Sequence, residues 1–160
     1  MLPCIAVWLL PVVARGQLFT NGAPGFGIQN TNSGGWYGAA ISTADWNNDG
    51  WPDLTLGSSG GGLRTYRNIE GSSFASTPLP WTMTSEVKAL IWVDLDNDGD
   101  DDLFVLEEEG RCGIVRNDGG TQFTLAGLGG FDIGLPQALT ESGGASCGDF
   151  DGDGDLDLHI

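Results

Sequence analysis

The chain has 160 residues and is strongly acidic, with 22 Asp and Glu residues against 6 Lys and Arg residues and a formal net charge of −16. It has no basic stripe that could neutralise phosphate groups, which argues against a nucleic-acid partner. After the amino-terminal leader no apolar run is long enough to cross a bilayer, so we expect no membrane span in the mature chain.

Residues 1–16 are interpreted as a secretory signal peptide. Ile5 to Ala14 forms an apolar core that is too short to span a membrane, and Ala14 and Gly16 lie three and one residues before a plausible cleavage point. The amino end lacks a Lys or Arg, and Arg15 lies close to the cleavage point, so a buried strand is the alternative. Cleavage would leave residues 17–160, of which residues 18–38 are expected to wrap onto the first sheet.

Three short loops carry carboxylates at alternate positions. The middle loop places Asp94, Asp96 and Asp98 two residues apart, continues with Gly99, and ends at Asp102 before an apolar run. Carboxylates packed this closely repel one another unless a cation lies between them, and calcium fits best because it accepts many oxygen ligands in a flexible shell. The alternative is three solvated acidic turns without metal, which the apolar residue after each loop disfavours.

The spacing therefore predicts up to three calcium ions, one for each loop. Side chains at loop positions one, three, five and nine and the backbone carbonyl at position seven would be the ligands, and the Gly at position six permits the sharp turn. The predicted ligands are Asp45, Asn47, Asp49, Trp51 and Asp53 in the first loop, Asp94, Asp96, Asp98, Asp100 and Asp102 in the second, and Asp149, Asp151, Asp153, Asp155 and Asp157 in the third. Asn47 replaces a carboxylate and is expected to weaken the first site.

The residues that flank the loops predict strands. A helix–loop–helix calcium site needs Glu at position twelve, where this chain has Leu56, Val105 and Ile160. A short apolar segment follows each loop, and another precedes the second loop at residues 87–93. Each loop is therefore expected to join two strands of a hairpin.

The similarity between the units extends beyond the loops, which start 49 and 55 residues apart. Residues 45–74 align with 94–123 without a gap, and the matches include Arg67 with Arg116, Asn68 with Asn117, Gly71 with Gly120, and Phe74 with Phe123. The Arg-Asn pair and the Gly predict a strand end and a tight turn, with Asn and Gly suited to positive φ, and each Phe opens another strand. Each unit would then have four strands, and the linkers at 75–93 and 124–148 are expected to be surface connections apart from the strand that enters each loop.

Four-stranded units in series predict an all-β fold made of β-propeller blades. The chain resembles the FG-GAP or VCBS repeats, the calcium-binding propeller repeats of the integrin-α type, because it has both their Asp-x-Asp-x-Asp-Gly-x-x-Asp-Leu loop and their trailing Arg-Asn-x-x-Gly-x-x-Phe segment. The resemblance covers residues 39–160, with repeats near 39–74, 88–123 and 144–160. It implies that blades close into a propeller, that the loops bind calcium, and that the protein is secreted or on the cell surface.

Three loops correspond to about two and a half blades, whereas a closed propeller needs at least about four. We therefore expect the sequence to be a fragment of a longer propeller; closure by another chain is the alternative.

The sequence offers little for catalysis. Its single His, His159, lies next to the end on a predicted strand, and no Ser lies in a nucleophile-elbow motif. We predict that the chain is not an enzyme and that it acts in extracellular recognition or adhesion through an unidentified protein or carbohydrate ligand. The alternative is an ancillary or truncated part of a secreted carbohydrate-active enzyme.

Roles are also predicted for several tryptophans, for two cysteines and for two short segments. Trp46 and Trp51 lie inside the first loop, where exposed indoles could stack on sugars, whereas Trp92 is expected in the core. Cys112 and Cys147 either bridge neighbouring repeats or are small core residues. Residues 58–62 are expected to form a flexible hairpin loop, and residues 107–109 a solvated strand end.

Overall fold

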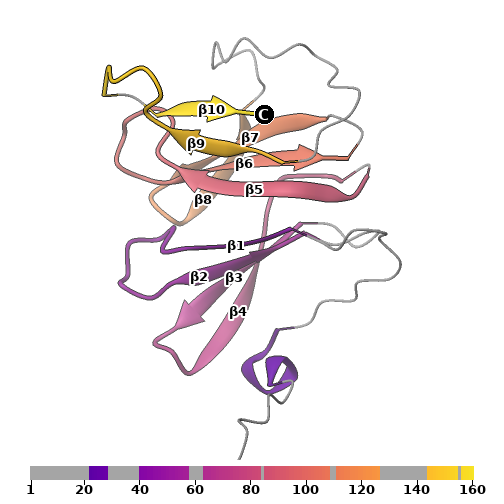
Figure 1. The fold of residues 1–160 in the computed structure, drawn as a ribbon. Coiled ribbons are helices and arrows are strands. Elements are labelled where there is room, and N and C mark those ends of the chain that lie inside the picture. The colour runs from indigo at the N-terminus through magenta and orange to yellow at the C-terminus, as the bar shows by residue number, and fades with distance from the viewer. Residues whose placement is uncertain are drawn as a thin grey trace, which may run out of the picture.

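The computed structural model describes residues 22–28, 40–57, 63–83, 85–108, 111–126, 144–154 and 156–160. Apart from a 3-10 helix, η1 (Ala23–Phe26), its regular elements are ten β-strands in three antiparallel sheets, which confirms the predicted all-β class (Figure 1). In this described part of the chain no helix has the length and apolar character needed to cross a membrane. The predicted signal peptide, the loop at 58–62 and Glu109 lie outside the described residues.

The first two sheets have the same order of strands. The first contains β1 (Ile41–Ala44), β2 (Asp53–Leu56), β3 (Arg64–Ile69) and β4 (Ser73–Pro78), each paired with the next. The second contains β5 (Val87–Val93), β6 (Asp102–Glu107), β7 (Cys112–Asp118) and β8 (Gln122–Ala126). A hairpin of β9 (Ser146–Gly148) and β10 (Asp157–His159) follows. The described residues thus form two complete four-stranded blades and two strands of a third.

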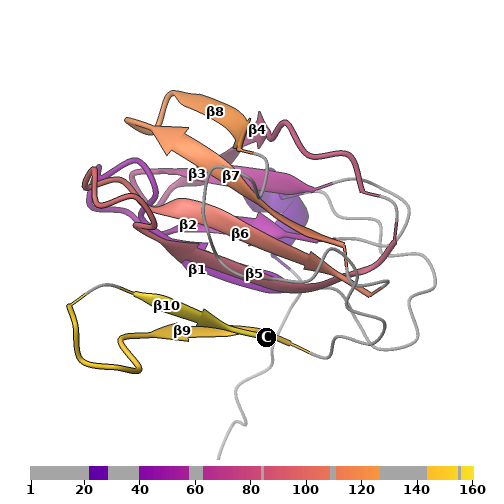
Figure 2. The same cartoon turned by 90° about the horizontal axis from the view of Figure 1, so that it is seen from above.

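The blades are stacked through their first strands. The strand β5 lies between β1 and β9 and contacts both, and the N–H of Ala40 donates to the carbonyl of Val87 across 3.3 Å. Figures 1 and 2 show that this stacking brings the turns β1–β2, β5–β6 and β9–β10 to the same end of the strands. The three acidic loops therefore lie along one end of the molecule. The short segment 22–28 lies beside β4, on the first blade.

Within the second blade, β6 is buried on both faces. All six residues of β6 are buried, and because side chains alternate along a strand they contribute to two clusters. Leu103 and Val105 pack with Val87 and Leu63 between the first and second blades. Phe104 and Leu106 belong to the other cluster, together with residues of the third unit such as Leu158 and Ile160. A strand that is covered on both sides needs a continuous apolar run, which is what residues 103–106 provide.

The linker between the first two blades is not a simple surface connection: that prediction is wrong at Leu79, Trp81 and Glu86, which are buried. Leu79 and Trp81 are 9% and 6% exposed and belong to the core between the blades. The linker runs from the outer strand of one blade to the inner strand of the next, so it crosses the junction and can fill it with apolar side chains.

Glu107 binds this linker to the second blade through hydrogen bonds. The prediction of a solvated strand end is therefore wrong at Glu107. Its carboxylate is fully buried and accepts hydrogen bonds from Trp81 Nε1 at 2.8 Å, from the Ser85 N–H at 2.8 Å and from Arg111 Nη1 at 2.9 Å. Arg111 also lies over the Trp81 ring, 4.4 Å from its centroid. Glu108, one residue further along, is exposed as expected.

Candidate metal sites

Each acidic loop closes a hairpin between the first and second strands of its unit. The residue before loop position one pairs with position nine in every case: Ala44 with Asp53, Val93 with Asp102, and Gly148 with Asp157. This pairing brings the carboxylate at position nine next to the start of the loop. The strand register, together with the loop length, thus gathers the two ends of each predicted ligand set.

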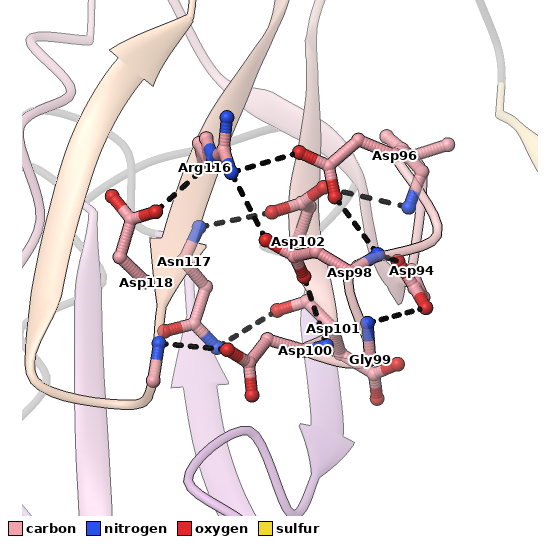
Figure 3. Close-up of polar contacts among 12 residues, drawn as sticks. Asp94, Asp96, Asp98, Gly99, Asp100, Asp101, Asp102, Arg116, Asn117 and Asp118 are labelled. Atoms are coloured by element: carbon pink, nitrogen blue, oxygen red, sulfur yellow. Dashed lines mark hydrogen bonds and ion pairs between the residues drawn. The ribbon is translucent and has the colours of Figure 1, made fainter.

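The carboxylate at position one accepts backbone N–H groups from across its loop. In the second loop Asp94 Oδ1 accepts from the N–H of Asp98 at 3.2 Å, and Asp94 Oδ2 from that of Gly99 at 3.0 Å (Figure 3). Asp45 accepts in the same way from Asp49 and Gly50, and Asp149 accepts from Gly154 at position six and from Gly152 at position four. These bonds hold each loop in a tight curve around its side-chain oxygens.

The curve requires left-handed backbone at two positions. Gly50, Gly99 and Gly154 at position six have φ of 88°, 94° and 97°, as the sequence predicts. Position four is also left-handed, with φ of 55° at Asn48, 58° at Asn97 and 79° at Gly152. The left-handed backbone at position four was not predicted from the sequence, although Asn and Gly are the residues that tolerate this conformation best.

The alternate side chains converge. Asp94, Asp96 and Asp98 each offer an oxygen, and these oxygens lie within 4.8 Å of one another, as do those of Asp149, Asp151 and Asp153. In the first loop Asn47 takes the place of a carboxylate, and its Oδ1 accepts the Asp49 N–H at 3.0 Å, as Asp96 Oδ1 accepts that of Asp98 at 3.3 Å. The amide oxygen of Asn47 therefore occupies the place of the missing carboxylate oxygen.

Position nine is deeply buried in the first two units. Asp53 and Asp102 are 1% and 0% exposed, and burial raises the pKa of each carboxyl to about 6. Asp102 accepts from the N–H groups of Asn117 at 2.9 Å and Leu95 at 3.4 Å. Asp53 Oδ1 accepts from Asn68 at 2.7 Å, but its buried Oδ2 has no hydrogen-bond partner. A buried carboxylate oxygen destabilises the fold unless a hydrogen-bond donor or a cation lies beside it. The residues therefore fit a metal ion.

The residues at position seven use their side chains elsewhere. Asp100 accepts from the Gly119 N–H at 2.8 Å and from Asn48 Nδ2 of the first loop at 3.3 Å. The indole of Trp51 is 42% exposed and lies over the turn at Gly71. Their side chains are directed away from their own loops, which leaves the backbone carbonyl as the group that position seven could offer. Asp155, the third predicted residue of this kind, lies outside the described residues.

At position five the side chain accepts the N–H of position seven. Asp98 Oδ1 accepts the Asp100 N–H at 3.0 Å, as Asp49 Oδ1 accepts that of Trp51 at 3.0 Å. This backbone bond, together with the Arg116 guanidinium, keeps the pKa of Asp98 below its usual value.

Asp157 at position nine of the third loop is exposed, and its Oδ2 accepts the N–H of Phe150 at 3.0 Å.

The Asn of the repeated Arg-Asn pair has a structural role that was not predicted from the sequence. Asn117 lies within β7, and the positive φ predicted for it occurs instead at Gly119 and Gly120. Its Nδ2 donates to the carbonyls of Asp101 at 3.0 Å and Trp46 at 2.7 Å, and its Oδ1 accepts the Gly120 N–H at 2.9 Å. Asn68 in β3 makes the corresponding bonds to Pro52 and Gly71. Each Asn therefore ties the turn of its blade to the acidic loop.

Trp46 is a core residue, so its proposed exposure is wrong. The side chain is 1% exposed, stacks on Trp92 with centroids 6.2 Å apart, and meets the edge of Phe123 at 5.2 Å. Trp92 is half-buried and packs against the core as expected. Of the two loop indoles only Trp51 is exposed, because position two of the loop faces the next blade and position seven faces outward.

The remaining candidates lie in the last two units. Cys112 and Cys147 are both free, the first half-buried beside the core and the second exposed, so this structure has no bridge between them. His159 is exposed, and its ring meets the edge of Phe150 at 6.2 Å.

The fold and the loops define a repeat protein built from β-propeller blades. The sequence profile of the FG-GAP-like repeat matches residues 45–105 and again residues 94–160. Because these two matches together span more than half of the chain, it belongs to the FG-GAP-like repeat family, as the resemblance implied.

Two curated relatives match part of the chain. Integrin alpha-3 of Cricetulus griseus is 37% identical over 60 aligned residues, which cover 32% of this chain and 6% of that protein. Integrin alpha-3 of Mus musculus has the same identity and the same coverage. The match therefore spans only a small part of the length of these relatives.

Proposed function

We propose that the chain is part of a secreted or cell-surface β-propeller that acts in extracellular recognition or adhesion, without catalysis of its own. Membership of the FG-GAP-like repeat family and the similarity to integrin alpha-3 support an adhesion-type role. The apolar leader supports export, with residues 1–16 as a signal peptide and 17–160 as the mature chain. The ligand class that fits this role is an extracellular protein or a carbohydrate.

Calcium binding at the three loops is the biochemical part of this proposal. The observation that carries it is the buried, unpartnered Oδ2 of Asp53 at the end of a loop whose other oxygens are already turned inward. Calcium would supply the charge that offsets repulsion among these oxygens, and it prefers such carboxylate, amide and carbonyl ligands. The proposed ligands in each loop are the side chains at positions one, three, five and nine and the carbonyl at position seven.

Isothermal titration of the purified chain with calcium chloride, combined with thermal unfolding in calcium and in chelator, tests this proposal. We expect calcium binding and a higher melting temperature, because a metal that binds only the folded state stabilises it by about 2.7 kcal/mol per site at a hundredfold excess over Kd. Asp98→Asn should weaken one site about tenfold or more through loss of a charged ligand. Glu108→Gln removes the same charge at an exposed position just beyond the end of β6, away from the loop, and should change neither quantity. A folded chain that neither binds calcium nor responds to it would refute the calcium sites.

The recognition role needs a separate experiment. The immobilised chain is screened against glycans and extracellular-matrix proteins in calcium and in chelator, beside assays for depolymerisation of soluble polysaccharides. Calcium-dependent binding without turnover is expected; turnover that Asp98→Asn leaves intact would instead favour the carbohydrate-active alternative.

A further inference from the structure

Arg116 extends from β7 over the second acidic loop. Its Nη2 lies 3.0 Å from Asp98 Oδ2 and 3.2 Å from Asp96 Oδ2, and its Nε lies 3.1 Å from Asp118 Oδ1 (Figure 3). Two of these three carboxylates are proposed calcium ligands. One guanidinium therefore joins positions three and five of the loop to β7, the third strand of the blade.

The first blade offers a natural comparison. Arg67 takes the same place in the repeat, but its one ion pair among the described residues is the 3.7 Å contact between its Nε and Asp49 Oδ2. The first loop has Asn47 at position three, where the second loop has Asp96. The closer, two-carboxylate contact thus occurs in the loop with the greater negative charge, as expected for a group that offsets carboxylate repulsion.

We propose that Arg116 is the internal counter-ion of the second loop, which stabilises the metal-free blade and competes with calcium for Asp96 and Asp98. The inference rests on the proposed calcium binding and assigns a role to a residue outside the ligand set. A guanidinium and a divalent cation that share the same two carboxylates repel each other, so one weakens the binding of the other. The Arg116 side chain is 41% exposed, so the effect is partly screened by solvent and salt.

Competition predicts effects of opposite sign on stability and on affinity. Without Arg116 the metal-free fold loses its counter-ion and melts at a lower temperature, whereas the calcium-bound fold loses a repulsive neighbour. The variant Arg116→Gln should therefore bind calcium more tightly than the wild type and show a larger calcium-dependent rise in melting temperature. If Arg116 instead oriented the carboxylates for the metal, the same variant would bind calcium more weakly.

The experiment measures calcium titration and thermal unfolding, in chelator and in calcium, for the wild type, Arg116→Gln, Arg116→Lys and Arg67→Gln. We expect Arg116→Gln to tighten one site about two- to fivefold at low ionic strength, with the difference shrinking at high salt. Arg116→Lys keeps the charge without the planar fork and should lie between the wild type and Arg116→Gln. Arg67→Gln makes the same charge change beside a single distant carboxylate and should have the smaller effect.

The outcomes separate this inference from the proposed function. Unchanged or weaker calcium binding in Arg116→Gln, with normal binding by the wild type, would overturn the counter-ion role and leave the calcium sites standing. Absence of calcium binding by the wild type would overturn both. If Arg116→Gln does not fold in chelator, Arg116→Lys carries the test, and an affinity at or below that of the wild type would refute competition.

Discussion

Asn117 shows how much a single amide contributes to this fold. It is fully buried in β7, and its three side-chain bonds reach the loop of its own blade, the turn after β7 and the loop of the preceding blade. The bond to Trp46 links residues 71 positions apart in the sequence. A residue with these partners cannot be replaced without leaving buried carbonyl and N–H groups unsatisfied.

Asn117→Ala is expected to lower the free energy of unfolding by about 2–4 kcal/mol, because three buried hydrogen-bonding groups lose their partner. Asn68→Ala is the matched control, since the described bonds of the Asn68 side chain stay within the first blade. Asn68→Ala should lower the free energy of unfolding by about 1 kcal/mol less than Asn117→Ala does, which is roughly the value of one hydrogen bond. Urea denaturation in chelator measures both variants, and equal losses would show that the bond to Trp46 adds nothing.

At the scale of elements, the linker at residues 79–86 and the end of β6 act together. Trp81 fills the junction between blades, and Glu107 accepts its indole N–H while pairing with Arg111. A buried carboxylate is tolerated here because several donors converge on it.

Glu107→Gln keeps the shape of this side chain but removes its charge, so we expect a loss of about 1–3 kcal/mol in stability. Glu108→Gln, at the exposed neighbouring residue, is the control. Its free energy of unfolding should stay within about 0.5 kcal/mol of that of the wild type. Chemical denaturation followed by tryptophan fluorescence reports the difference. Similar midpoints for the two variants would mean that the carboxylate of Glu107 does not hold the linker.

The elements also show which parts of the fold could be predicted from the sequence. Loop spacing and short apolar runs predicted the hairpins and the four strands of each blade, since these features depend on neighbouring residues. The burial of Glu107 and Trp46 and the partners of Asn117 could not be predicted, because they depend on tertiary contacts with the linker, with another blade or with a loop distant in the sequence. The left-handed position four could have been predicted from Asn48, Asn97 and Gly152, because it too is a local property.

At the scale of the whole molecule, the blades are held together by apolar side chains at their junctions. Trp46 belongs to the first blade but is buried against Trp92 and Phe123 of the second. Its removal would open a cavity between the two sheets. The junction, more than either sheet alone, is then expected to set the cooperativity of unfolding.

Trp46→Ala should reduce stability by about 3–5 kcal/mol, the usual cost of deleting a large buried aromatic side chain. Differential scanning calorimetry should then show a broader transition or two separate ones, as the blades unfold less cooperatively. Trp51→Ala, at the exposed indole of the same loop, is the control and should leave a single transition. A single sharp transition in Trp46→Ala as well would place the coupling between blades elsewhere.

The contact between Asn117 and the first loop has a consequence for how such proteins can be cut and recombined. The first loop is completed partly by residues of the unit that follows, since Asn117 bonds to Trp46 and Gly120 lies against Asn47. A graft that exchanged one sheet alone would separate a loop from the turn that supports it. A module that keeps these contacts therefore runs from the first loop through Gly120, beyond residue 105, where the first FG-GAP-like match ends.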